Sequence, residues 1–70
     1  MEQYKEFKKI ALTPCFWIVI RNDLPVGYII RGLNSSHHVY DTDFMQVMND
    51  LPSMSSAYNS FTKAVSEQNL

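Results

Sequence analysis

The chain has 70 residues, of which 46% are hydrophobic and 19% are charged, and its formal net charge is −1. This composition is too apolar for a disordered segment, and a domain of this length buries only about 60% of its unfolded surface. The near-neutral charge excludes a polybasic protein that coats nucleic acid or anionic lipid through bulk charge. We therefore expect one small domain over residues 1–70, in which every large apolar side chain matters.

The chain has one cysteine, Cys15, which cannot form an internal disulfide. Small secreted domains usually compensate for a thin core with several disulfides, so this count favours a cytoplasmic protein. Residues 2–9 lack the apolar core of a signal peptide. No run reaches the roughly 20 apolar residues that span a bilayer, so we expect no membrane contact.

The first predicted element is a short amphipathic helix at the N-terminus. Apolar side chains recur at helical spacing along it, namely Tyr4, Phe7, Ile10 and Ala11. The residue before a proline is disfavoured in the α region, so Thr13 ends this helix before Pro14.

Two apolar runs then predict a β-hairpin over residues 16–21 and 26–33, joined by the turn-forming residues 22–25. A second turn at residues 34–36 allows residues 37–40 to pair back as a third, shorter strand. A loop of two or four residues in the hairpin places Tyr28 and Ile30 on the face of Trp17. A loop of odd length places both side chains on the face of Ile18 instead, and the sequence leaves this register open.

Two helices are predicted after the third strand. The first begins at Asp41 or Thr42 and ends at Pro52, with an apolar stripe made of Phe44, Val47, Met48 and Leu51. Ser53 caps the second, whose stripe contains Met54, Ala57, Tyr58, Phe61, Ala64 and Val65. The expected fold class is therefore α+β, a three-stranded antiparallel meander with an N-terminal helix and two C-terminal helices, in the order α-β-β-β-α-α.

Both faces of the predicted hairpin carry large apolar side chains, because residues alternate across a strand. Trp17 and Val19 share one face, while Phe16, Ile18 and Ile20 share the other. A sheet with one solvated face normally alternates apolar and polar residues, so the second face needs a cover. The candidates are helices from the two ends of the chain, a second copy, a different protein and nucleic acid.

The residue types that support chemistry do not form a recognisable set. Four metal-ligating types lie within seven residues, namely His37, His38, Asp41 and Asp43. Adjacent residues on a strand point to opposite faces, so the two imidazoles are badly placed to share an ion. Cys15 lies beside aromatic residues and is best interpreted as a small buried hydrophobe. We expect no enzyme activity, no catalytic residue, no metal, no cofactor and no small-molecule substrate.

The sequence favours a small non-enzymatic regulator, adaptor or inhibitor that binds another protein, of the kind carried by phages and other mobile elements, and a homodimer is one form of this binding. The large side chains expected to anchor the partner are Trp17, Val19, Tyr28, Tyr58 and Phe61. The alternative is a small nucleic-acid-binding protein that uses the sheet and the basic residues Lys5, Lys8, Lys9, Arg21 and Arg31.

Overall fold

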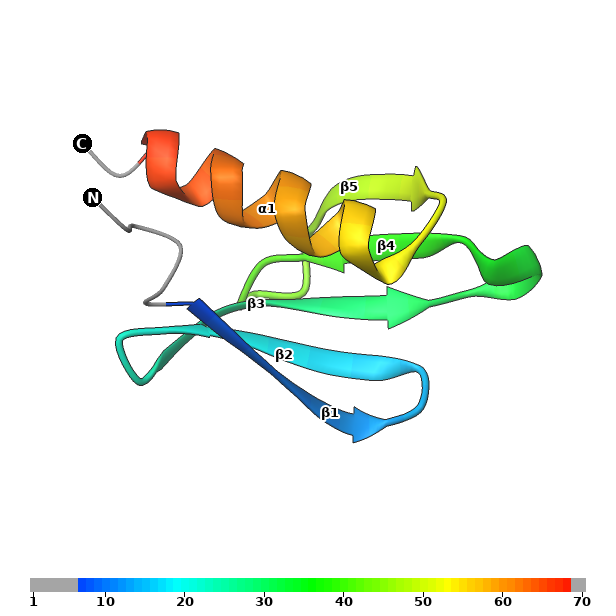
Figure 1. The fold of residues 1–70 in the computed structure, drawn as a ribbon, viewed down its shortest axis with the longest axis horizontal. Helices are drawn as coiled ribbons and strands as arrows, with labels where there is room; N and C mark the ends of the chain where they lie inside the picture. Colours follow the sequence, from blue (N-terminus) through cyan, green and yellow to red (C-terminus); the bar gives the residue numbers. More distant parts are fainter. Residues whose placement is uncertain (1–6, 69–70) are drawn as a thin grey trace.

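The computed structural model describes residues 7–68, which form a five-stranded antiparallel sheet and one C-terminal helix (Figure 1). The strands follow the chain in meander order as β1 (Phe7–Thr13), β2 (Phe16–Arg21), β3 (Leu24–Arg31), β4 (His37–Tyr40) and β5 (Gln46–Leu51). A one-turn 3-10 helix, η2 (Leu33–Ser35), joins β3 to β4, and α1 (Met54–Gln68) follows β5. The arrangement is α+β, but the predicted order with three strands and helices at both ends is wrong. β2 and β4 coincide with predicted strands.

The first correction concerns the N-terminal segment, where residues 7–13 form strand β1 and not a helix. Tyr4 lies outside the described residues. The apolar positions of this segment also fit a period of two, since Ile10 and Leu12 alternate with Lys9 and Ala11. As a strand, β1 pairs with β2 and satisfies the backbone groups along that edge of the sheet. A lone helix of this length would be marginal in water.

The second correction concerns residues 42–51, where strand β5 replaces the predicted helix. The Asp41 carboxylate, predicted to cap that helix, closes a loop instead. Its Oδ1 accepts hydrogen bonds from the backbone N–H groups of Asp43, at 2.9 Å, and Met45, at 3.0 Å. The loop turns the chain back so that β5 pairs with β4, with Met48 opposite Val39. Pairing as a strand therefore places Met48, a residue of the predicted helical stripe, against the core.

The hairpin between β2 and β3 closes through a two-residue turn. Asn22 and Asp23 have φ values of 53° and 67°, and Arg21 pairs with Leu24 across the turn. Positive φ at both central residues is the geometry of a type I′ turn, which Asn and Asp tolerate better than most residues. The loop is therefore of even length.

A β-bulge in β3 nevertheless reverses the direction that a loop of even length would give to the later side chains. The register shifts after the pair formed by Ile20 and Pro25, so that Val19 pairs with Gly27 and Val26 is the extra residue. Tyr28 therefore pairs with Ile18 and points to the same face. The bulge gives the hairpin the face assignment that a loop of odd length would have given.

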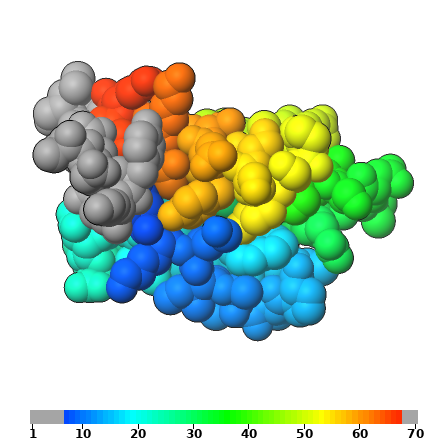
Figure 2. Space-filling model, in the orientation of Figure 1, coloured from blue at the N-terminus to red at the C-terminus, as the bar shows by residue number. Residues whose placement is uncertain are grey.

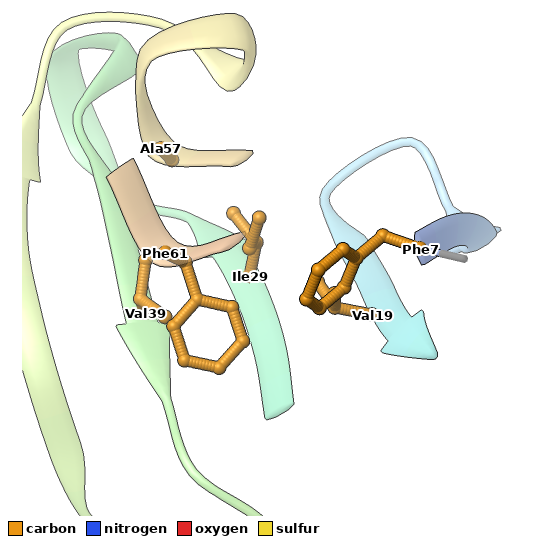
Figure 3. Packing of buried hydrophobic residues seen from close by; sticks show 6 residues of the cluster. All are labelled: Phe7, Val19, Ile29, Val39, Ala57 and Phe61. Atoms are coloured by element: carbon orange, nitrogen blue, oxygen red, sulfur yellow. The ribbon is translucent and has the colours of Figure 1, made fainter. Parts of the chain in front are cut away.

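The hydrophobic core lies in one layer between the sheet and α1, as Figure 3 shows. The buried hydrophobic residues among those described are Phe7, Val19, Ile29, Val39, Ala57 and Phe61. The helix begins where the sequence predicts, because the backbone N–H of Ser56 donates to the Ser53 Oγ at 3.0 Å. α1 packs mainly on β3, β4 and β5. The strands β1 and β2 extend beyond the helix at the lower edge of the space-filling view (Figure 2).

Candidate functional site: an uncovered apolar sheet face

The side of the sheet opposite α1 forms an apolar surface, which we call the open face. Its central row follows the strand pairing from Ile10 through Ile18 and Tyr28 to Tyr40 and Gln46. Register and alternation together assign to it Lys8, Ile10, Thr13, Phe16, Ile18, Ile20, Tyr28, Ile30, His38, Tyr40 and Gln46. Alternation from Ile10 adds Leu12, the extra residue of a bulge in β1. No helix or strand among residues 7–68 covers this face.

Aromatic rings occupy the middle of the open face. The Tyr28 and Phe44 rings are stacked, with centroids 4.5 Å apart and an interplanar angle of 3°. The Phe16 ring also lies beside Tyr28, with centroids 5.8 Å apart and an angle of 59°. Phe44 comes from the loop between β4 and β5 and has φ of 62°. The loop conformation therefore adds a third ring to a pair that the two strands provide.

Exposure differs sharply between the two sides of the sheet. Val19, Ile29 and Val39 face α1 and are 0% exposed. On the open face, Ile10 is 46% exposed and Leu12 is 53% exposed, while the residues of β2 and β3 are half-buried by their neighbours. Most large side chains of the open face thus keep part of their apolar surface in contact with water.

Polar groups lie at the periphery of the open face. Lys8 lies on the edge strand β1, and Asp50 lies opposite His38 on the other edge strand, β5. At the other side, the Gln46 amide nitrogen donates to the Tyr40 hydroxyl at 3.3 Å. The backbone N–H of Asp50 donates to Nδ1 of His38 at 3.5 Å. The apolar centre is therefore bordered by a polar rim on both sides.

Only one of the five predicted anchor residues lies on the open face, namely Tyr28. Val19 and Phe61 belong to the core and offer no surface to a partner in this structure. Trp17 and Tyr58 are half-buried against the same core on the helix side. The alternation of residues along β2 correctly predicted that Phe16 and Ile18 share a face. The bulge brings Tyr28 and Ile30 to the same face, and the strongest sign of this bulge in the sequence is Pro25 and Gly27 at its two ends.

The basic residues of the nucleic-acid alternative do not gather around the aromatic rings of the open face. The Lys9 Nζ lies 4.6 Å from the centroid of the Tyr58 ring, on the helix side. The Arg21 guanidinium carbon lies 5.2 Å from the Phe7 ring centroid, also on that side. Lys5 lies outside the described residues.

The thiol and the imidazoles are dispersed over the two sides of the sheet. An Arg31 terminal nitrogen lies 3.7 Å from the Cys15 Sγ, at the end of the first hairpin. His37 is buried beside Trp17, with ring centroids 5.9 Å apart, whereas His38 lies on the open face. Within residues 7–68, no three His, Cys, Asp or Glu side chains are placed to hold a metal ion together.

A groove of about 490 Å³ lies on the helix side, between the second half of α1 and the ends of β3 and β5. Its apolar lining includes Val26, Met48 and Val65, with Asp41 and Thr42 as the polar residues. The groove and the open face are therefore separate surfaces.

Comparison with protein-family models, curated protein sequences and solved structures finds no match for the chain. The α1 helix is not long and apolar enough to cross a membrane, and it is the only α-helix among residues 7–68.

Proposed function

We propose that the protein is a small non-enzymatic binding protein, acting as a regulator, adaptor or inhibitor, whose partner is a protein bound at the open face. One observation carries this proposal, which is that a contiguous apolar and aromatic surface lies on the side of the sheet that α1 leaves uncovered. Antiparallel sheets with a solvated face normally present polar side chains there. Contiguous exposed apolar patches mark interaction sites.

The arrangement of the open face supports a binding role in energetic terms. Burial of apolar surface contributes about 25 cal/mol per Å², and aromatic residues near the centre of an interface dominate its energy. The Tyr28 ring contacts the rings of both Phe16 and Phe44, and these contacts hold it in position before any partner binds. A preorganised ring loses little rotamer freedom on binding.

The distribution of charge favours a protein partner over nucleic acid. Sheet surfaces that bind single strands combine stacking aromatic rings with a positively charged groove that follows the phosphates. Among residues 7–68, Lys8 is the one basic side chain assigned to the open face, while Lys9 and Arg21 contact rings on the helix side. The single cysteine of the chain supports a cytoplasmic setting for the protein. The phage-like character of such short regulators rests on analogy.

Site-specific photo-crosslinking tests the proposal directly. A photoreactive phenylalanine analogue replaces Tyr28 in one variant and the exposed Asn59 of α1 in the control. Irradiation in cells that express each variant should yield a protein adduct from position 28 and none from position 59, with the partner identified by mass spectrometry. Equal adducts at both positions, or adducts only with nucleic acid at position 28, would contradict the proposal.

A further inference from the structure

We infer that the partner on the open face is a second copy of this chain, packed sheet against sheet with twofold symmetry. The inference rests on the proposed function of the open face and names its partner. It follows from three features of the described residues: the distribution of polar groups over the open face, the size of that face and the thinness of the core.

The distribution of polar groups suits contact between identical faces. In a twofold interface the same patch meets itself, so an apolar centre meets an apolar centre and a polar rim meets a polar rim. The centre formed by Ile18, Tyr28 and Ile30 contains no charge that would be buried without a partner. Foreign partners are commonly selected through complementary charges, and this centre offers none. Self-association requires only the apolar match that is present.

The flat area of the open face is slightly below the lower limit of stable dimer interfaces, and its protruding side chains add to that area. Five strands spaced about 4.8 Å apart, with about six residues of about 3.4 Å each, span a flat area on the order of 490 Å². The accessible area exceeds this flat area because side chains such as Phe44 and Leu12, at 56% and 53% exposure, stand out from the sheet. Stable interfaces begin near roughly 600 Å² per partner. A dimer would therefore use the whole face.

The core provides the third argument. Only six hydrophobic residues are buried among residues 7–68, and all belong to the layer between α1 and the sheet. Domains of about 70 residues rarely obtain more than about 3–5 kcal/mol from a single core, and small domains add disulfides, metals or oligomerisation. The one cysteine of these 70 residues forms no internal disulfide. A second copy adds a second apolar layer, in the order helix, sheet, sheet, helix.

Sedimentation velocity over about 1–100 µM protein tests the inference, because a dimer dissociates on dilution. We expect the wild-type chain to sediment as a dimer and Ile18→Lys, at the centre of the open face, as a monomer. Leu12→Lys, which alters an exposed side chain at the rim, should raise the dimer dissociation constant at least about tenfold, which equals about 1.4 kcal/mol. Asn59→Lys adds the same charge on the exposed side of α1 and should leave the dimer intact.

The outcomes separate this inference from the proposed function. A wild-type monomer over the whole concentration range overturns the inference. If that monomer still forms an adduct with a foreign protein from position 28, the proposed function stands, and if it forms none, both fail. A dimer that survives both Ile18→Lys and Leu12→Lys also overturns the inference. Circular dichroism identifies an unfolded Ile18→Lys chain, in which case Leu12→Lys decides.

Discussion

At the scale of single residues, Gly27 marks a close approach between α1 and the sheet. A Cβ atom at this position would lie 2.5 Å from Cζ of Phe61 and 2.7 Å from the carbonyl oxygen of Tyr40. Both distances are shorter than van der Waals contact, and the Tyr40 oxygen belongs to the backbone, which cannot move aside as a side chain can. The Phe61 ring therefore lies on the sheet only because residue 27 has no side chain.

We expect Gly27→Ala to lower the free energy of unfolding by about 1–3 kcal/mol, because the extra methyl group overpacks a closed core. Urea denaturation followed by circular dichroism measures this change. Gly32→Ala is the matched control, since its Cβ would meet the His38 side chain at 3.0 Å, outside the core. A Gly27→Ala protein as stable as Gly32→Ala would contradict the packing of Phe61 against β3.

Tyr58 gives the stability of the protein a dependence on alkaline pH. Burial raises the pKa of the Tyr58 hydroxyl above its ordinary value of 10.0, since desolvation disfavours the phenolate. The unfolded chain therefore loses this proton at lower pH than the folded chain. The resulting stabilisation is present below about pH 10 and is lost as the pH rises through the folded pKa.

We expect the urea midpoint of the wild-type protein to fall more steeply than that of Tyr58→Phe between about pH 9 and pH 11. The other tyrosines and the lysines titrate in both proteins, so the difference between the two curves isolates Tyr58. Parallel curves would show that the hydroxyl is as well solvated in the folded chain as in the unfolded one.

At the scale of elements, the β2–β3 hairpin shows that the length of a turn does not by itself decide which face of the sheet the later side chains occupy. The turn at Asn22 and Asp23 has an even length, one of the alternatives that the sequence left open. The extra residue at Val26 then shifts the register, so Tyr28 lies on the open face. A register is set by every residue between the turn and the pair in question, so the turn alone could not decide it.

The turn itself can be tested by Asp23→Gly. The φ of Asp23 is 67°, a conformation that costs residues with a Cβ roughly 1–2 kcal/mol and glycine almost nothing. After allowance for the greater freedom of glycine in the unfolded chain, we expect a stabilisation of up to about 1 kcal/mol. Asp23→Ala, which lacks the polar side chain that tolerates this region, should be destabilised. Thermal unfolding of the three proteins checks this order.

Two segments predicted as helices became strands for a reason that acts beyond the segment. The apolar positions of residues 7–13 fit a helical period and a strand period almost equally well, whereas those of residues 42–51 fit the helical period better. The edges of β2 and β4 offered unpaired backbone groups, and pairing with them as β1 and β5 satisfied both partners. The segment at residues 54–65 is helical as predicted, because its apolar stripe extends over three turns and Ser53 caps it.

At the scale of the whole molecule, the open face should control association by the hydrophobic effect and not by charge. We expect sodium sulfate to strengthen the association, because excluded salts favour apolar burial. Raising sodium chloride from about 50 to 500 mM should change the dissociation constant less than about threefold, since the central row of this face contains no charged side chain. Sedimentation in each salt provides the measurement. A steep weakening in sodium chloride would indicate ionic contacts, as phosphate binding would produce.

The sequence by itself determined the features that depend on neighbours along the chain. These include the β2 and β4 strands, a turn within residues 22–25, the Ser53 cap of α1 and the presence of large apolar groups on both faces of the hairpin. Only the tertiary structure decided which segments complete the sheet, where the bulge falls and which face α1 covers. These outcomes depend on backbone pairing and burial between residues far apart in sequence, and local propensity contains no information about them.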